Sequence, residues 1–159
     1  MKSEDIKTLQ IANELLLPEV IRMTDEGHTV TLPLRGFSMR PFLEDGRDKA
    51  LLCKPTSINV GDAVLAEIAP RQYVLHRIID ISGDHVTLRG DGNLNVEHCL
   101  TGDVKATALG FYRKGREKLD STKGRKWRVY SYVWTRLFHI RRYLLAFYRR
   151  IWLKLFKPI

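Results

Sequence analysis

The chain has 159 residues, enough for one hydrophobic core of ordinary size and an appendage. Its composition, 44% hydrophobic and 28% charged with six prolines and eleven glycines, excludes a low-complexity or disordered chain. The formal net charge of +9 is concentrated at one end: residues 124–159 contain ten Lys or Arg and no acid, whereas residues 1–123 contain seventeen basic and eighteen acidic residues. This asymmetry predicts an anionic partner for the C-terminal part.

Cys53 and Cys99 are too few and too far apart for a disulfide framework, and neither belongs to a Cys-x-x-Cys or His/Cys cluster typical of zinc sites. We therefore expect two reduced thiols. The polar residues 1–7 lead into no long apolar run, so neither a secretory signal nor a membrane anchor is expected there. Charges interrupt every later apolar run well short of the roughly 20 residues that a spanning helix needs.

Residues 1–27 are predicted to form an N-terminal helical segment. Pro18 can serve as the first residue of a second short helix, and Gly27 is expected to end it. The apolar residues at helical spacing in the first helix are Ile6, Leu9, Ala12 and Leu16.

From residue 28 to 112 the pattern is that of short strands separated by turn signals, which predicts a compact, mainly antiparallel β domain. The turns contain Gly with Asp or Asn, as at 44–46, 60–62, 82–84 and 90–93. The predicted strands are His28–Arg35, Lys49–Lys54, Ala63–Ile68, Tyr73–Ile81, His85–Arg89 and Val104–Tyr112.

Residues 113–126 contain almost nothing to bury and are predicted to be a linker, followed by a basic, aromatic amphipathic helix over 127–159. One apolar row on this helix comprises Val133, Leu137, Ile140, Leu144, Phe147, Ile151 and Leu155. A parallel row comprises Trp134, Phe138, Leu145, Tyr148, Trp152 and Phe156. The narrower opposite side carries Arg128, Arg136, His139, Arg142, Arg149 and Arg150.

Three polar residues in the β domain are candidates for chemistry. Ser38 follows a predicted strand in a Gly-x-Ser turn, which suits either a plain turn or a presented nucleophile. His76 interrupts an apolar strand, as a core histidine or as a general base. Asp91 stands in an Asp-Gly turn, where it either shapes a hairpin or orients a histidine.

Taken in order, four motifs resemble the signal peptidase I superfamily of serine peptidases, which includes the self-cleaving SOS repressors. These are Gly-x-Ser-Met-x-Pro at 36–41, Val-Gly-Asp at 60–62, His-Arg-Ile at 76–78 and Gly-Asp-x-Asn at 90–93. The resemblance spans about residues 30–112 and implies that superfamily's antiparallel β fold. His-Arg is similar to the archaeal and endoplasmic-reticulum signal peptidases, which implies a Ser-His rather than a Ser-Lys enzyme.

The resemblance implies Ser38 as nucleophile, His76 as base and Asp91 as the acid that orients it, with Glu97 as a secondary acid. The motif departs from the family in reading Gly-Asp-Gly-Asn and in having Glu at 97 where Asp is usual. Position 36 is Gly where signal peptidases often have a serine that helps the oxyanion hole, so backbone N–H groups around Ser38 or another donor must serve. The apolar neighbours Met39 and Phe42 are substrate-cleft candidates, with buried packing as the alternative role.

These features predict a membrane-associated serine endopeptidase that cleaves a peptide or precursor protein through an acyl-enzyme and needs no cofactor. The alternative is a catalytically inactive, signal-peptidase-like adaptor that binds a membrane or a protein through its basic tail. Residues 127–156 favour an anionic membrane surface, which places the protein in the cytoplasm at the inner face of the membrane. Nucleic acid is disfavoured because the apolar side is too wide, and packing of the tail on the β domain, a partner helix or a second copy of the chain stays open.

Overall fold

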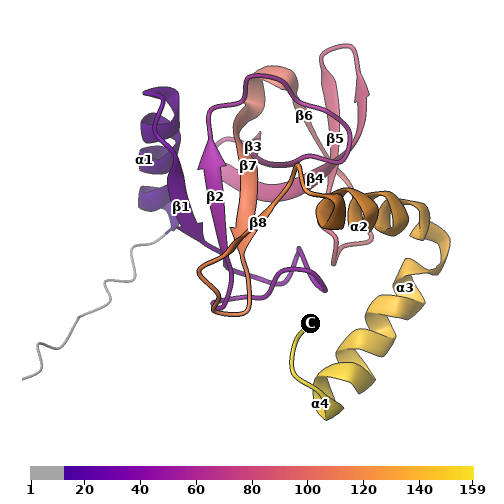
Figure 1. Ribbon diagram of the computed structural model, residues 1–159. Helices are drawn as coiled ribbons and strands as arrows, with labels where there is room; N and C mark the ends of the chain where they lie inside the picture. The colour runs from indigo at the N-terminus through magenta and orange to yellow at the C-terminus, as the bar shows by residue number, and fades with distance from the viewer. Residues whose placement is uncertain (1–12) are drawn as a thin grey trace, which may run out of the picture.

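The computed structural model describes residues 13–159, and Ile6, Leu9 and Ala12 of the predicted first helix lie outside the described residues. The first element is a single helix, α1 (Asn13–Asp25), which lies against one end of the sheet (Figure 1). The prediction that Pro18 starts a second helix is wrong, because Pro18 lies inside α1. Leu17 and Val20, on either side of the proline, are both buried in the same core, and this shared packing holds one continuous helix.

The body is one antiparallel sheet of eight strands, which confirms the predicted mainly antiparallel β fold. The order across the sheet is β1-β2-β7-β3-β4-β5-β6, with β8 paired to β7. Each of the six predicted strand segments contains a strand. The strands are β1 (Val30–Pro33), β2 (Lys49–Cys53), β3 (Ala63–Ala69), β4 (Gln72–Ser82), β5 (His85–Arg89), β6 (Glu97–Leu100), β7 (Val104–Tyr112) and β8 (Leu119–Ser121). A short 3-10 turn, η1 (Thr101–Asp103), joins β6 to β7.

The two strands that the sequence pattern missed are short. In β6 only Cys99 is buried, opposite Val86 of β5, so the alternation is too brief to stand out. Residues 113–126, expected to form a linker, instead contain β8, which pairs with the end of β7. Gly110 permits this pairing, since a Cβ there would lie 2.7 Å from Leu119 Cγ and 2.8 Å from the Asp120 carbonyl oxygen.

The sheet coils so that β6 also contacts β3, and apolar residues gather in two clusters. The larger cluster joins α1, β1, β2, β3 and β7 to the turn around Met39 and to Trp127. The smaller one fills the coil between β3, β4, β5 and β6, around Ile78 and Leu88. Side chains alternate between the two faces of a sheet along each strand, so consecutive residues of β4 contact different parts of the structure. This alternation decides where His76 and Arg77 point.

The C-terminal region is not the single helix predicted over 127–159. It consists of α2 (Arg125–Arg136), α3 (Phe138–Phe147), a π-helical turn η2 (Tyr148–Trp152) and the short α4 (Leu153–Leu155). The break falls at Leu137, where the buried Arg141 guanidinium donates to the Trp134 carbonyl oxygen at 2.6 Å. Because a side chain satisfies that carbonyl, the chain can turn between α2 and α3 (Figure 1). Among residues 13–159, no helix combines the length and the apolar character needed to cross a bilayer.

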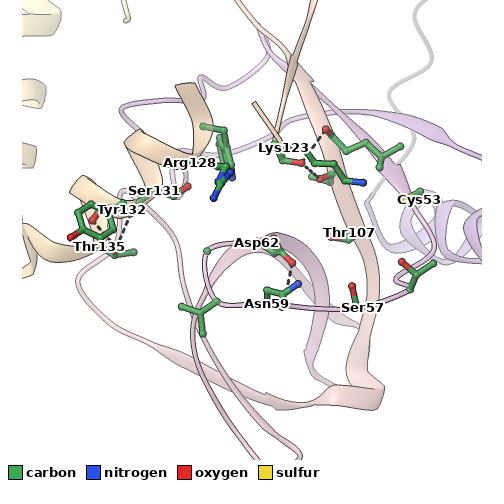
Figure 2. A pocket seen from close by; sticks show the side chains of 17 residues that line it. Cys53, Ser57, Asn59, Asp62, Thr107, Lys123, Arg128, Ser131, Tyr132 and Thr135 are labelled. Atoms are coloured by element: carbon green, nitrogen blue, oxygen red, sulfur yellow. Dashed lines mark hydrogen bonds between the residues drawn. The ribbon is translucent and has the colours of Figure 1, made fainter. Parts of the chain in front are cut away.

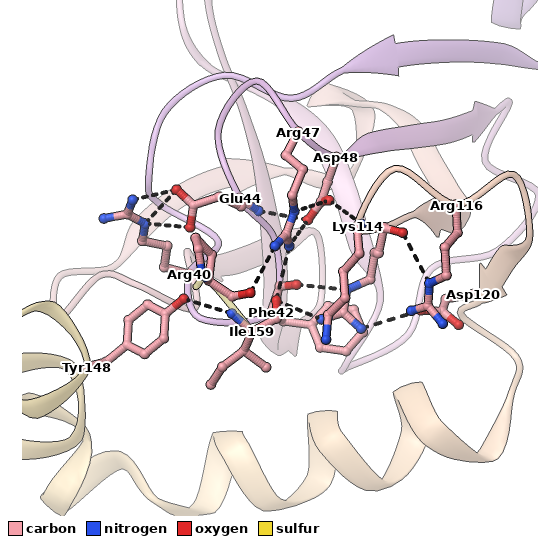
Figure 3. Close-up of polar contacts among 12 residues, drawn as sticks. Arg40, Phe42, Glu44, Arg47, Asp48, Lys114, Arg116, Asp120, Tyr148 and Ile159 are labelled. Carbon is pink, nitrogen blue, oxygen red and sulfur yellow. Dashed lines mark hydrogen bonds and ion pairs between the residues drawn. The ribbon is translucent and has the colours of Figure 1, made fainter. Parts of the chain in front are cut away.

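The last residues fold back onto the β domain, as Figures 1 and 3 show. Arg47 donates to the carbonyl oxygens of Pro158 and Ile159 at 3.1 and 3.0 Å, and the Ile159 N–H donates to the Tyr148 hydroxyl at 3.3 Å. Asp48 holds Arg47 in turn, accepting from its Nε at 2.7 Å and from a terminal nitrogen at 2.8 Å. The C-terminal helices are thus attached to the domain at both ends.

Candidate active site

Ser38 lies on a long connection between β1 and β2 whose shape is set by glycine and carboxylate contacts. Gly36 has a φ of +84°, a left-handed conformation that favours glycine, and its N–H donates to Asp45 Oδ1 at 2.7 Å. Asp48 closes the far end of the connection by accepting from the Glu44 N–H at 2.9 Å. The turn leaves Ser38 half-buried beside the fully packed Met39.

The loop Gly90–Asn93 is seated directly against the Ser38 backbone. The Gly92 N–H donates to the Ser38 carbonyl oxygen at 2.7 Å. A Cβ on Gly90 would lie 2.4 Å from that oxygen and 3.0 Å from His76 Nε2. Only a residue without a side chain allows this approach, so the glycines of the Gly-Asp-Gly-Asn motif bring the serine segment and the histidine ring to the same point.

His76 is 3% exposed and contacts a carboxylate through one ring nitrogen. Its Nδ1 lies 2.9 Å from Glu97 Oε2, on β6. With Nδ1–H donating to Glu97, Nε2 is the free acceptor, and it faces the Ser38 segment. Burial lowers the pKa of His76 below its usual value, while the Glu97 carboxylate opposes that shift. Burial thus favours the neutral ring, and a carboxylate that only accepts hydrogen bonds favours the Nδ1–H tautomer, which a general base acting through Nε2 requires.

Asp91 does not orient His76, contrary to the sequence-based prediction. Its carboxylate accepts from Arg77 Nε at 2.8 Å and from an Arg77 terminal nitrogen at 2.7 Å. It also accepts from the Tyr130 hydroxyl at 3.0 Å, and its backbone carbonyl accepts from Trp134 Nε1 at 3.0 Å. Arg77 and Asp91 are both essentially buried, so this cluster is a structural joint between the β domain and α2.

The alternation of side chains between the two faces of β4 explains why Glu97, rather than Asp91, contacts His76. His76 lies on the same face of β4 as Ile78, which pairs with Leu88, and Leu88 in turn pairs with Glu97. Arg77 points to the other face, where α2 packs and where Ser131 accepts a hydrogen bond from its guanidinium. An acid that binds Arg77 therefore stands on the wrong face for the imidazole.

Ser38 and His76 line one cleft of about 320 Å³. Met39 also lines it, although it is buried in the main core; Phe42 does not, because it packs between Trp127 and Tyr130. Within residues 13–159, no lysine borders the cleft and no hydrogen bond joins Ser38 Oγ to His76. The full lining is Leu34, Arg35, Gly36, Ser38, Met39, Leu43, Glu44, Tyr73, Val74, Leu75, His76 and Asn93.

Two kinds of N–H donor lie near Ser38. The backbone N–H groups of Ser38 and Met39 have no hydrogen-bond partner within the described part of the chain. Asn93 also lines the cleft: its Nδ2, like His76 Nε2, lies within 3.0 Å of the point that a Cβ on Gly90 would occupy. Such donors stabilise charge that develops on a carbonyl oxygen during acyl transfer.

Sequence reasoning missed the roles of Asn93, Arg77 and Tyr130. Asn93 was visible as the last residue of the Gly-Asp-x-Asn motif, but its position in the cleft depends on how the loop folds over Ser38. Tyr130 lies in the segment predicted to form an amphipathic helix, but it belongs to neither of the two apolar rows recognised there. Burial raises the pKa of Tyr130, with the nearby Asp91 charge adding to the effect, so the phenol remains a donor.

A second, larger pocket of about 590 Å³ lies between α2 and the segment from Cys53 to Asp62 (Figure 2). Arg128 and Lys123 stand on one side and Asn59 with Asp62 on the other, and the Asn59 N–H donates to Asp62 at 2.8 Å. The pocket shares no lining residue with the cleft at Ser38. Its Ser57 provides a hydroxyl outside the candidate site.

Comparison with known proteins adds no assignment. No family model, no curated protein and no solved structure matches this chain. What the cleft can do chemically follows from its own side chains.

Proposed function

We propose that this chain is a serine endopeptidase in which Ser38 is the nucleophile, His76 the general base and Glu97 the acid that orients His76. The main observation that supports the proposal is the position of the His76 imidazole. Its Nδ1 is engaged by Glu97, and its Nε2 faces the Ser38 segment inside a cleft. A serine hydroxyl becomes an effective nucleophile only when such a base accepts its proton.

The reaction proceeds through an acyl-enzyme. Ser38 Oγ attacks the carbonyl carbon of the scissile peptide bond while His76 Nε2 takes the hydroxyl proton. His76 then gives that proton to the leaving amine as the C–N bond breaks. Water, deprotonated by the same nitrogen, attacks the ester and releases the acyl product and free Ser38. Glu97 stabilises the imidazolium that forms in each half-reaction, and Asn93 with the backbone N–H groups of Ser38 and Met39 stabilises the oxyanion.

The lining of the cleft supports an extended peptide substrate. Residues 73–75 of β4 line the cleft and pair with β3 on one side, whereas β5 pairs only with the later part of β4, from Arg77 on. The free edge of residues 73–75 can therefore hydrogen-bond to an extended peptide. The side chains around it are both apolar, as Val74 and Leu75 are, and charged, as Arg35 and Glu44 are.

The proposal is tested by labelling the full chain with a fluorophosphonate probe. We expect the wild-type protein to be labelled covalently and Ser38→Ala to remain at background. Ser57→Ala is the matched control, because Ser57 is exposed in the separate pocket of Figure 2, and it should label like wild type.

The same three proteins are then incubated with a diverse peptide library, and new termini are read by mass spectrometry. Cleavage by wild type and Ser57→Ala but not by Ser38→Ala is the expected result. Equal background for wild type and Ser38→Ala in both assays would overturn the peptidase and leave the adaptor as the better account.

A further inference from the structure

The C-terminal helices carry a strip of exposed apolar side chains that the β domain does not cover. Tyr143, at 65% exposed, and Val129, at 62%, lie beside the first of the two rows recognised in the sequence. The exposed members of that row, called here the outer row, are Val133 at 46%, Ile140 at 48%, Phe147 at 51%, Ile151 at 46% and Leu155 at 69%. Exposed apolar residues that continue through three helical elements constitute a patch rather than scattered surface residues.

The other row is buried by the protein itself at three of its six positions, whereas its members Phe138 and Phe156 are exposed. Trp134, Leu145 and Tyr148 are buried, with Trp134 donating to the Asp91 carbonyl and Tyr148 accepting from the Ile159 N–H. Packing of this row fixes the rotation of the helices and turns the outer row away from the domain. The outer row therefore needs an external occupant.

A groove of about 500 Å³ continues the strip onto α2. Its lining is almost wholly apolar, with Val129, Tyr130 and Val133 at its surface. Arg125 and Lys126 stand at its edge. The apolar surface thus extends from the start of α2 to α4, bordered by cations.

The charges around the strip identify the chemistry of the occupant. Residues 124–159 contain no acid, and among their basic side chains Lys126 is paired with Asp120 of β8 at 2.9 Å. No salt bridge within residues 13–159 involves the basic side chains that follow Lys126. A second copy of the chain would bring an equally cationic face into contact and be repelled. Nucleic acid would leave the wide apolar strip in water. The exposed basic side chains that neighbour the outer row at helical spacing are Arg136, Arg150 and Lys154.

We propose that this outer face is a docking surface for an anionic membrane. The outer row enters the interface between headgroups and acyl chains, while the flanking arginines bind lipid phosphates, as in interfacial amphipathic helices. The exposed aromatic ring of Tyr143, beside the outer row, suits the headgroup region.

Docking through this surface would hold the candidate active site close to the bilayer. The helices are joined to the β domain at Asp91 through Trp134 and Tyr130 and at Arg47 through the backbone of Pro158 and Ile159. The Arg89 guanidinium also stacks on the Phe138 ring at 4.3 Å. The surface is therefore attached rigidly to the domain that carries the cleft.

The experiment is flotation of the full chain with vesicles of phosphatidylcholine alone or mixed with phosphatidylglycerol. It is performed on Ser38→Ala, so that binding is scored without any peptide cleavage and stands or falls separately from the proposed function. We expect binding to the mixed vesicles, weak binding to neutral ones, and release at high salt. Equal binding to both vesicle types, or none to either, would overturn the proposal.

Two pairs of variants locate the surface. Arg150→Gln/Lys154→Gln removes two exposed charges beside the strip and should weaken binding roughly 30-fold, at about fivefold per charge. Lys114→Gln/Lys118→Gln makes the same charge change on the β domain and should bind like the parent. Leu155→Ser should weaken binding several-fold, whereas Leu15→Ser, a leucine of matching exposure on α1, should not.

The remaining outcomes also decide the matter. Variants at 150, 154 and 155 that bind vesicles like their controls would overturn the proposal. So would light scattering that shows a dimer lost on Leu155→Ser, or duplex DNA that competes fully with vesicles for the protein. Circular dichroism on each variant confirms that the fold is retained, which is expected because every side chain substituted in the Ser38→Ala parent is exposed.

Discussion

Arg77 and Asp91 face each other with two parallel hydrogen bonds of 2.7 and 2.8 Å, both side chains almost completely buried. The pair is extended by Tyr130 and Ser131 of α2, so it joins the strand that carries His76 to the first C-terminal helix. Asp91, in the Gly-Asp-Gly-Asn motif, thus has a structural role and connects the β domain to α2. The carboxylate that contacts His76 is that of Glu97, on β6. The predictions below separate these two kinds of carboxylate.

Glu97→Gln should impair catalysis without unfolding the protein. The amide cannot stabilise the imidazolium, so kcat should fall about 10²–10⁴-fold. Glu97 raises the pKa of His76, so its loss lets burial lower that pKa further. The base acts when neutral, and activity is lost as pH falls through its pKa, so the acidic limb of kcat/KM should move to lower pH. Glu117→Gln, an exposed carboxylate, serves as control; a limb that moves to higher pH contradicts the proposed pairing.

Tyr130→Phe should reduce stability more than chemistry. The hydroxyl donates to a buried carboxylate, and its removal should lower the free energy of unfolding by about 1–2 kcal/mol. Tyr132→Phe is the matched control, since Tyr132 is exposed on the same helix and should change stability by less than about 0.5 kcal/mol. Urea denaturation of the two variants compares them directly. A stability loss of equal size in both would mean that the bond to Asp91 contributes little.

Gly90→Ala should disturb the candidate site selectively. The added Cβ would come within 2.4 Å of the Ser38 carbonyl oxygen and 3.0 Å of His76 Nε2, so the loop or the serine segment must shift. We expect fluorophosphonate labelling to slow at least tenfold, because acyl transfer depends on placement within about an ångström. Gly102→Ala, where a Cβ meets nothing within 4 Å, should label at the wild-type rate. Unchanged labelling of Gly90→Ala would remove this loop from the site.

Asp48→Asn should destabilise the connection that carries Ser38. Burial alone would raise the pKa of Asp48, but hydrogen bonds from Arg47 and from the Lys114 and Glu44 N–H groups outweigh it and lower the pKa. A folded-state pKa below the unfolded value of about 3.9 stabilises the protein above that pH and is lost on acidification. The substitution should therefore cost about 2–4 kcal/mol at pH 7. In thermal melts the gap from wild type should narrow below about pH 4, and a gap independent of pH would argue against an ionised Asp48.

Much of the fold is determined locally. Short runs rich in apolar residues from Ala63 to Ile68 and from Tyr73 to Ile81 predict strands, because continuous apolar runs of this length bounded by turn signals are typical of buried strands. The Gly-Asp turns that flank them, at 61–62 and 83–84, favour antiparallel neighbours. Strand β8 could not be seen in this way, since three residues with one apolar side chain carry no periodicity, and only the space above Gly110 makes room for it.

The sequence alone predicts part of the candidate site. The order of the motifs singles out Ser38 and His76, and the structure places both in one cleft. The choice between Asp91 and Glu97 was beyond the sequence, because it depends on which face of β4 each acid reaches after the sheet coils. That face follows from the register of β4 with β5 and of β5 with β6, a property of the assembled sheet.

In the C-terminal segment, the contributions of local sequence and of tertiary structure can be separated most clearly. Its helical spacing and its ten basic residues are local facts, and they establish two apolar rows and a cationic flank. Both rows are apolar enough to be buried, so their sequence alone does not rank them. In the folded protein the row of Trp134 and Tyr148 packs on the domain, because the Trp134 indole donates to the Asp91 carbonyl and the Tyr148 hydroxyl accepts from the Ile159 N–H. The outer row is thereby left exposed.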